Sequence, residues 1–325
     1  MSSDNLPWVE KYRPAKLDDV CGQNDVIQTV RKFAKEGRIP HLLFYGPPGT
    51  GKTSTIIALA RELYGKNYRN MVLELNASDD RGIDVVRDQI KNFASTRQIF
   101  NSGFKLIILD EADAMSNAAQ NALRRVIEKY TKNTRFCILA NYSHKLNPAL
   151  LSRCTRFRFS PLADSALQDR VDHVIKVEGL KIAPDARQSL LELSEGDMRR
   201  ALNVLQACAT AVESGEEITQ DMVYECVGAP RPQSVMTVLD AIMSNDWTDA
   251  YATMTKIRKT EGLALVDLMS SFVSVLDRYE LKPRTRMAVL QGLGDIEYSI
   301  SKGGSDKIQC TAVIGVIKNA LENEN

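Results

Sequence analysis

The sequence predicts an α/β domain with a parallel five-stranded sheet and flanking helices, followed by two all-helical domains. In the first half, short apolar runs alternate with amphipathic stretches, which is typical of parallel strands covered by helices on both faces. In the second half, apolar residues recur with helical spacing. The expected strands are 41–45, 71–76, 105–110, 135–140 and 155–159, and the clearest helices between them are 52–65 and 118–130.

The chain changes character after Pro161. The stretches 164–179, 184–196 and 197–215 have apolar residues at helical spacing, and each ends near a glycine. The segment GAPRP, at 228–232, interrupts this pattern because its two prolines and its glycine cannot continue a helix. About five more amphipathic helices follow, with no convincing strand. We therefore expect three domains, at residues 1–162, 163–229 and 230–325.

The sequence contains 42 lysines and arginines against 41 aspartates and glutamates, so its net charge is close to zero. Any contact with nucleic acid must therefore come from locally clustered cations or from several subunits together. The six cysteines lack the spacing of a zinc site or a disulfide framework. No secretory signal opens the sequence, and its apolar runs are too short for a bilayer, so we expect a soluble intracellular protein.

The strongest motif is GPPGTGKT at 46–53, which fits the pattern G-x-x-x-x-G-K-[ST]. It follows an expected strand and opens a helix, which is the context in which such a loop binds the phosphates of ATP. Its glycines let backbone N–H groups wrap around phosphate oxygens. Lys52 would reach the β- and γ-phosphates, and the Thr53 hydroxyl would ligate Mg²⁺. The alternative is a Gly/Pro turn that matches the motif by chance.

Polar side chains also end two other expected strands. Asp110 and Glu111 follow the apolar run LIIL, at the carboxyl edge of the sheet where α/β folds bind their ligands. Asp110 would hold Mg²⁺, directly or through water, and Glu111 would orient and deprotonate the attacking water. Asn141 ends the next strand and would hold that water or a phosphate oxygen. The alternative for the acidic pair is a simple cap of the following helix.

Together these motifs resemble an AAA+ ATPase of the clamp-loader type. The resemblance rests on the loop 46–53, LDEAD at 109–113, the strand end at Asn141, LLSRC at 150–154 and GDMRR at 196–200. WVEKYRP at 8–14 and ASDDRGID at 77–84 are similar to the small subunits of eukaryotic replication factor C. The resemblance runs through the whole chain. It implies that the three expected domains are an AAA+ nucleotide-binding domain, a helical lid and a helical collar.

The resemblance also implies roles for single residues. Arg153 would be an arginine finger that completes the ATP site of a neighbouring subunit, and Arg199 would be a second sensor that contacts the γ-phosphate in its own chain. From the residues alone, Arg153 would instead be a surface arginine paired with an acid. Val9, Arg13 and Val20 would lie beside the adenine and its phosphates. The other expected nucleotide contacts are Gly46, Pro47, Pro48, Gly49, Thr50, Gly51, Lys52, Thr53, Ser54, Asn141 and Arg199, with Mg²⁺ on Thr53 and Asp110.

A clamp loader opens a sliding clamp and places it on primer–template DNA. The resemblance therefore implies other replication factor C subunits, a clamp of the PCNA type and DNA as partners, and a location in the nucleus. Arg81, Arg87 and Lys91 are candidate contacts to the DNA backbone, although interleaved acids also fit a solvated helix face. Ile99 and Phe100 are candidates for docking the clamp, or else core residues that precede the next strand.

Two other functions fit part of the pattern. A branch-migration or remodelling AAA+ ATPase would share the ATP site, but no appended DNA-translocating element is recognisable. A scaffold that binds ATP without hydrolysing it is disfavoured by the intact set of Lys52, Thr53, Asp110 and Glu111. The sequence therefore favours an ATPase subunit of a heteropentameric clamp loader, with an active site that a neighbouring subunit completes.

Overall fold

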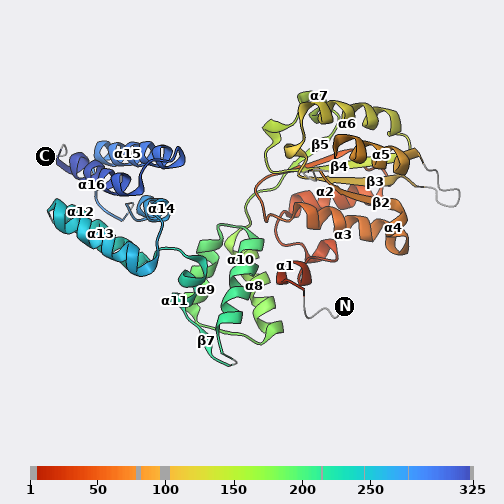
Figure 1. The fold of residues 1–325 in the computed structure, drawn as a ribbon. Helices are drawn as coiled ribbons and strands as arrows, with labels where there is room; N and C mark the ends of the chain where they lie inside the picture. The colour runs from red at the N-terminus through yellow and green to blue at the C-terminus, as the bar shows by residue number, and fades with distance from the viewer. Residues whose placement is uncertain are drawn as a thin grey trace. The chain divides into compact units, whose positions relative to one another are not determined.

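The chain forms two compact units, Met1–Ile218 and Thr219–Asn325 (Figure 1). The computed structural model describes residues 6–77, 82–95, 103–213, 215–244, 246–276 and 278–322, with the backbone alone at 82–87. The first unit holds a parallel sheet with its helices and the helical segment that follows it. The described residues of the second unit contain helices as their only regular structure. The three-domain division at residues 162 and 229 stays a prediction.

The sheet of the first unit consists of five parallel strands, as the sequence predicts. They are β1 (Leu42–Tyr45), β2 (Val72–Asn76), β3 (Lys105–Asp110), β4 (Thr134–Ala140) and β5 (Thr155–Arg158). Their order is β2-β3-β4-β1-β5, so β4 lies between β3 and β1. Because all the strands are parallel, their carboxyl ends meet at one edge of the sheet, where α/β folds bind ligands. The predicted phosphate loop and the predicted polar strand ends therefore come together at this edge.

Helices cover both faces of the sheet (Figure 1). On one face, α2 (Asn24–Lys35) and α3 (Lys52–Tyr64) contribute to a core that includes Phe44 of β1. On the other face, α5 (Gly82–Ser95), α6 (Asn117–Tyr130) and α7 (Pro148–Leu151) pack around Leu43 and its neighbours. Alternate residues of β1 thus enter opposite cores, which explains why this strand is apolar throughout. The short helices of this region are α1 (Trp8–Lys11), η2 (Leu17–Asp19), η3 (Gly65–Asn67), α4 (Tyr68–Met71), η4 (Ala112–Ala114) and η5 (Ser143–Lys145).

Three helices follow the sheet within the first unit: α8 (Asp164–Glu178), α9 (Pro184–Ser194) and α10 (Met198–Ala211). Their apolar stripes are buried, with Val171, Leu190 and Leu205 fully inaccessible to solvent. The sequence does not predict the short parallel pair formed by β6 (Lys181–Ile182) and β7 (Glu217–Ile218). Strands of two residues are too short to show a periodic pattern, which explains the omission.

The second unit contains α11 (Gln220–Val227), α12 (Pro232–Ser244), α13 (Trp247–Glu261), α14 (Leu265–Leu276), α15 (Pro283–Ser301) and α16 (Asp306–Glu322). One hydrophobic core joins α12 to α16. The apolar face of α14 lies in this core, with Phe272 fully buried, and Val273 on the same helix is 45% exposed. Burial within the unit therefore accounts for most of the apolar pattern of α14. Among the described residues, no helix is both long enough and apolar enough to span a membrane.

A buried histidine ties β1 to β4. His41 immediately precedes β1 and is 8% exposed. Its Nδ1 atom accepts a hydrogen bond of 3.1 Å from the backbone N–H of Phe136, so this nitrogen carries no proton. Burial, helped by the nearby charge of Arg135, lowers the pKa of His41 to about 4. The folded unit therefore holds a neutral imidazole over most of the physiological pH range.

We predict that His41 makes the first unit less stable in mild acid. Since the histidine pKa is about 6.5 in the unfolded chain and about 4 in the folded one, the unfolded chain takes up the proton first, and stability falls as the pH drops below about 6.5. We expect this residue to remove about 2 kcal/mol of the free energy of unfolding between pH 7 and pH 5.

The control is His41→Asn, which keeps an acceptor near the Phe136 N–H but does not titrate. Denaturant unfolding at both pH values measures the free energy of unfolding of each protein. The loss on acidification should be smaller in the variant by about 2 kcal/mol. An equal loss in both proteins would contradict the role assigned to His41.

Candidate nucleotide-binding site

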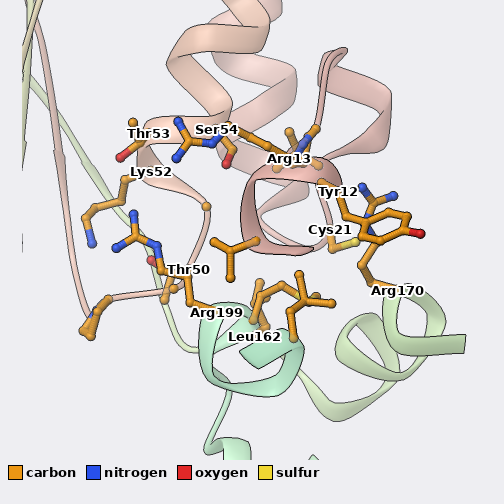
Figure 2. A pocket seen from close by; sticks show the side chains of 18 of the residues that line it. Tyr12, Arg13, Cys21, Thr50, Lys52, Thr53, Ser54, Leu162, Arg170 and Arg199 are labelled. Atoms are coloured by element: carbon orange, nitrogen blue, oxygen red, sulfur yellow. Dashed lines mark hydrogen bonds between the residues drawn. The ribbon is translucent and has the colours of Figure 1, made fainter. Parts of the chain in front are cut away.

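A pocket lies at the carboxyl edge of the sheet in the first unit (Figure 2). Its lining comes from the segment 9–21 around α1 and η2, the loop after β1 with the start of α3, the ends of β3 and β4, Leu162, Arg170 of α8 and the start of α10. The predicted nucleotide and catalytic residues that line it are Val9, Arg13, Val20, Asp110, Glu111, Asn141, Arg199 and the loop residues Pro48, Gly49, Thr50, Gly51, Lys52, Thr53 and Ser54. The structure thus gathers these residues in one place, and their contacts to a nucleotide stay predictions.

The loop between β1 and α3 has a backbone shape that needs glycine. Gly46 has φ 146° and Gly49 has φ 68°, in the range that residues with a side chain rarely adopt. A Cβ atom on Gly46 would lie 2.0 Å from the carbonyl oxygen of Phe159. The Thr50 hydroxyl donates a hydrogen bond of 2.9 Å to the carbonyl of Pro47 and holds the loop closed from within. The loop is therefore preformed for an anion at the N-terminus of α3.

Lys52 is a buried cation at the centre of the site, with a relative exposure of 7%. Its Nζ atom donates hydrogen bonds to the carbonyls of Gly46 (2.7 Å) and Pro47 (2.7 Å) and to Asn141 Oδ1 (3.0 Å). Gly46 and Pro47 thus belong to the site through their carbonyl groups. Burial lowers the pKa of Lys52 to about 8, although the carboxylate of Asp110 opposes this effect. The ammonium stays largely protonated at pH 7, which suits it to bind a phosphate.

A hydroxyl and a carboxylate meet beside the lysine. The Thr53 hydroxyl donates a hydrogen bond of 2.9 Å to Asp110 Oδ2, which joins the start of α3 to the end of β3. The other carboxylate oxygen of Asp110 accepts from the backbone N–H of Glu111 at 2.9 Å. Glu111 has φ 54° and an exposed side chain in the lining of the pocket. The two acids therefore take different positions, one held by α3 and one open to solvent.

Asn141 follows β4, between the phosphate loop and Asp110, because β4 lies between β1 and β3. Its side chain contacts Lys52, as described above, and its backbone N–H donates to Asp113 Oδ2 at 3.2 Å. The N–H of Tyr142 donates to the same oxygen at 3.1 Å. Asp113 is not among the site residues predicted from the sequence. The only sequence signal for it is its place at the end of the motif LDEAD, three residues after Asp110.

The start of α10 rests directly on the phosphate loop. Asp197 caps this helix by accepting hydrogen bonds from the backbone N–H groups of Arg199 (2.7 Å) and Arg200 (3.2 Å). The N–H of Met198 donates to the carbonyl of Gly49 at 3.3 Å. A Cβ atom on Gly49 would lie 1.6 Å from Asp197 Oδ1, so the loop and the helix approach as closely as glycine allows.

This contact places Arg199 at the pocket. Figure 2 shows its side chain extending toward the same part of the pocket as that of Lys52. The charge of Arg199 contributes to the lowered pKa of Lys52, although less than burial does. The two cations therefore face a common region where an anion would neutralise both.

The opposite end of the pocket contains residues that the sequence analysis missed, among them Tyr12, Cys21 and Arg170 (Figure 2). Arg170 of α8 donates to the backbone carbonyl of Tyr12, and the Tyr12 hydroxyl donates to Glu178 at the end of the same helix. Lys11 forms an ion pair of 2.6 Å with Glu178. The segment around α1 is thus fastened to α8. No sequence pattern indicates these contacts because the two segments are more than 150 residues apart.

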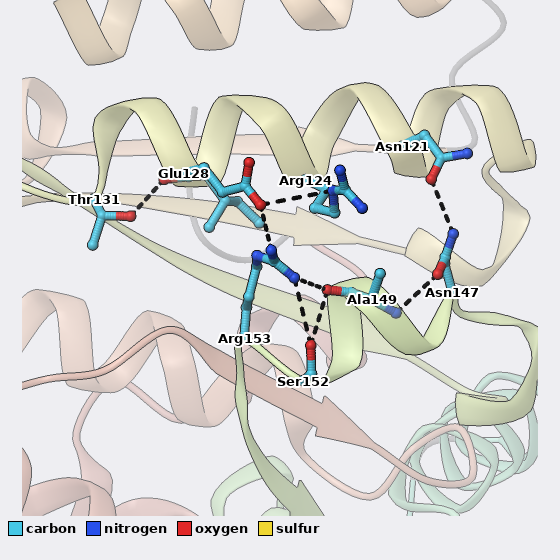
Figure 3. A network of polar contacts seen from close by, with 9 residues as sticks. Asn121, Arg124, Glu128, Thr131, Asn147, Ala149, Ser152 and Arg153 are labelled. Atoms are coloured by element: carbon cyan, nitrogen blue, oxygen red, sulfur yellow. Dashed lines mark hydrogen bonds and ion pairs between the residues drawn. The ribbon is translucent and has the colours of Figure 1, made fainter.

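Arg153 does not line the pocket of its own chain. It follows α7, and its guanidinium forms an ion pair with Glu128 of α6 and donates a hydrogen bond of 2.5 Å to the carbonyl of Ala149 (Figure 3). Arg124, also on α6, lies 3.7 Å from the same Glu128 carboxylate. Arg153 is about one-third exposed. The structure therefore separates this residue from the other predicted catalytic residues.

The predicted DNA and clamp contacts are only partly described. Arg81, Ile99 and Phe100 lie outside the described residues, and Arg87 belongs to α5 without a described side chain. Lys91 is partly exposed on α5, with its Nζ atom 3.6 Å from the carboxylate of Asp88. This pairing is compatible with a solvated helix face as well as with a DNA contact, so the DNA and clamp residues remain predictions.

Comparison with known proteins settles the family. Two family models match the chain: the ATPase family associated with various cellular activities (AAA) at residues 42–162, and the replication factor C C-terminal domain at residues 230–316. Replication factor C subunit 3 of Saccharomyces cerevisiae is 66% identical over 326 residues, covering 99% of this chain and 96% of the yeast protein. The chain belongs to the replication factor C family.

Other similarities agree with this assignment. Human replication factor C subunit 5 is 50% identical over 315 residues, covering 97% of the chain and 92% of the human protein. Within the family, the motifs favour the type called subunit 3 in fungi and subunit 5 in humans, and these relatives confirm that prediction. The structure of the RuvB Holliday junction branch migration motor of Thermotoga maritima is similar in fold, with a TM-score of 0.54 and 16% identity over 84% of this chain and 93% of that one.

Membership of the replication factor C family confirms the predicted AAA+ fold and the resemblance to clamp loaders. The chain is an ATP-binding ATPase subunit of the clamp-loader type. The similarity to RuvB concerns the fold alone, so the branch-migration alternative is not favoured.

We predict that Gly49→Ala weakens ATP binding by about tenfold or more. Its Cβ atom would collide with the side chain of Asp197, so either this carboxylate would leave its capping position or α10 would move away from the loop. A cost of about 1.4 kcal/mol in the bound state corresponds to a tenfold weaker affinity. The matched control is Gly37→Ala, because Gly37 has a similar φ of 65° but no atom near the added Cβ. Titration with a fluorescent ATP analogue measures both affinities, and equal values would contradict the importance of this contact.

Proposed function

We propose that this chain binds ATP and Mg²⁺ in the described pocket and hydrolyses ATP as one subunit of a heteropentameric clamp loader. The complex would open a sliding clamp and load it on primer–template DNA. The observation that carries this proposal is the split between Arg153 and the rest of the site: the lysine, acids and amide for hydrolysis line one pocket, whereas Arg153 lies outside it. An active site of this kind requires a neighbour.

The oxygen donors at the end of β3 fit the requirements of Mg²⁺. Thr53 Oγ1 and Asp110 Oδ2 are 2.9 Å apart, and this hard cation prefers hydroxyl and carboxylate oxygens together with water and phosphate. Thr53 would therefore ligate the ion, and Asp110 would hold it directly or through water. The bound ion would neutralise charge on the β- and γ-phosphates.

The remaining pocket residues have distinct tasks in hydrolysis. Lys52, already desolvated, would exchange its carbonyl partners for the β- and γ-phosphates. Glu111 would accept the proton of the attacking water, and Asn141 would orient that water or the γ-phosphate. Arg199 would contact the γ-phosphate from α10, so nucleotide binding would depend on the position of this helix. Val9, Arg13 and Val20 would lie beside the adenine and its phosphates.

Arg153 would act in trans as an arginine finger. Its guanidinium lies on the surface beside α6 and α7, where a neighbouring subunit can present its own nucleotide. A guanidinium that stabilises the charge developing on the transferred phosphoryl group contributes roughly 10³–10⁵ to the rate in related ATP- and GTP-hydrolysing sites. The partner needed to complete the site of this chain would supply an equivalent arginine.

The proposed partners follow from the family. They are other replication factor C subunits, a sliding clamp of the PCNA type and primer–template DNA, in the nucleus. Arg81, Arg87 and Lys91 are the proposed contacts to the DNA backbone, and Ile99 and Phe100 are the proposed anchor for the clamp. The relatives at 66% and 50% identity are named as numbered subunits of replication factor C, which supports an assembly of several chains.

We predict that Arg153→Ala leaves ATP binding by this chain unchanged but lowers turnover in the assembled complex. Loss of the finger would disable the neighbouring site, with a rate decrease at that site of about 10³-fold or more. Turnover of ATP with clamp and primed DNA measures this effect, and titration of the isolated chain measures its own affinity. The control is Arg31→Ala, since Arg31 is similarly exposed and also paired with an acid, Asp18.

Two results would contradict the proposed role of Arg153. If Arg153→Ala has the same turnover and clamp loading as the control, Arg153 is an ordinary surface charge and the shared-site proposal fails. Strong DNA-stimulated turnover by the isolated chain would also contradict it, because no neighbour would then be needed.

A further inference from the structure

The end of β4 depends on a carboxylate from the turn that follows β3, that of Asp113. The ladders of β4 end at Ala140, which pairs with Tyr45 of β1, and no strand partner continues to Asn141. Asp113 receives the two backbone N–H groups that come next, those of Asn141 and Tyr142, at 3.2 and 3.1 Å. A carboxylate that accepts two successive N–H groups fixes the direction of the backbone that carries them. The path of the chain at Asn141 is therefore set by Asp113.

The same contact orients a side chain within the pocket. Asn141 Oδ1 accepts a hydrogen bond of 3.0 Å from Lys52 Nζ, which also donates to two carbonyls of the phosphate loop. Asn141 thus connects Asp113 to Lys52, because its backbone N–H binds the Asp113 carboxylate and its side chain binds the lysine. Asp113 itself does not line the pocket. The charge of Asp113 reaches Lys52 through space, where it opposes the lowering of the lysine pKa, although less than Asp110 does. Its hydrogen bonds, in contrast, act on the position of the reacting groups through Asn141.

Asp113 also belongs to the turn that follows the two proposed catalytic acids, Asp110 and Glu111. It lies in η4, three residues after Asp110 and two after Glu111. Ala112, between Glu111 and Asp113, is fully buried, and Glu111 is held at φ 54°. The turn after β3 therefore has little freedom to move on its own. A carboxylate anchored in this turn fixes the end of β4 relative to the proposed general base.

We propose that Asp113 is a positioning residue for ATP hydrolysis: it holds Asn141 at a fixed distance from Glu111 and Lys52 by binding the backbone of β4. This inference rests on the role proposed for Asn141 in orienting the water or the γ-phosphate. A shift of about 1 Å in such a group can lower a rate by about 100-fold without a comparable loss in binding. The expected signature is therefore a lower kcat with nearly unchanged affinity for ATP.

The test is a double-mutant cycle in the assembled complex with clamp and primed DNA. The four versions of this chain are wild type, Asp113→Ala, Asn141→Ala and the double variant. Because the complex has other ATP sites, turnover at this site is taken as the part that Lys52→Ala removes. We expect Asp113→Ala to lower this part of kcat by about 10- to 100-fold. In the Asn141→Ala background, the same change should cost less than about twofold, because Asp113 acts through Asn141.

Three further variants distinguish the effect of the position of the Asp113 carboxylate from the effects of its charge and of the stability of the chain. Asp113→Asn keeps an oxygen acceptor for both N–H groups, so its kcat should stay within about threefold of wild type. Asp113→Glu keeps the charge but displaces the carboxylate by one methylene, and it should lower kcat by about tenfold even if Asp113→Ala fails to fold. Asp185→Ala removes another carboxylate that accepts a backbone N–H, that of Ala186, and should leave kcat unchanged.

Several results would overturn the inference. One is an equal loss of kcat from Asp113→Ala in the wild-type and Asn141→Ala backgrounds, which would mean that Asp113 does not act through Asn141. Another is wild-type turnover in both Asp113→Ala and Asp113→Glu. If Asn141→Ala alone keeps wild-type turnover, the proposed role of Asn141 fails and this inference fails with it. The proposal of a shared ATP site is tested separately, through Arg153.

Discussion

The positive charge of Lys52 is enclosed by protein, and the arrangement of the site follows from how that charge is held. Burial disfavours the ammonium, so it needs oxygen atoms on several sides. The carbonyls of Gly46 and Pro47 and the amide of Asn141 provide them. The two carbonyls reach the lysine because the loop after β1 is tight, and the amide reaches it because β4 lies next to β1. In the proposed function, a nucleotide phosphate would replace these neutral dipoles with a full negative charge beside a side chain that is only 7% exposed.

Much of this arrangement can be predicted from the sequence. The apolar runs of β1, β3 and β4 become central parallel strands because their side chains are buried on both faces, and the continuous hydrophobicity of LIIL shows this directly. The edge strands β2 and β5 are more exposed. Once the strands are parallel, their carboxyl ends must share an edge, so Asp110 and Asn141 converge with the phosphate loop. The helical second unit also follows from its apolar spacing. These features depend on patterns within one segment at a time.

Other features cannot be predicted from such patterns. The contact between Gly49 and Asp197 joins two segments almost 150 residues apart, and it depends on how a helix approaches a loop. The attachment of Tyr12 to Arg170 is of the same kind. Asp113 looks like a surface acid in the sequence, and only the end of the β4 ladder reveals two N–H groups in need of an acceptor. Arg153 belongs to a recognisable motif, but only the structure shows that it lies outside the pocket of its own chain.

Two helices, α3 and α10, begin at the pocket, and they differ in the charge that their N-termini present to it. The N-terminus of α3, at Gly51, has no side-chain cap, so its partial positive charge remains available to an anion. The N-terminus of α10 is already neutralised by the carboxylate of Asp197. An anion in the pocket would therefore meet a helix dipole on one side and the exposed guanidinium of Arg199 on the other. The attraction to the α3 dipole is fixed by the backbone, whereas the attraction to Arg199 varies with the rotamer of its side chain. A bound nucleotide would therefore be held more rigidly on the α3 side of the pocket than on the α10 side.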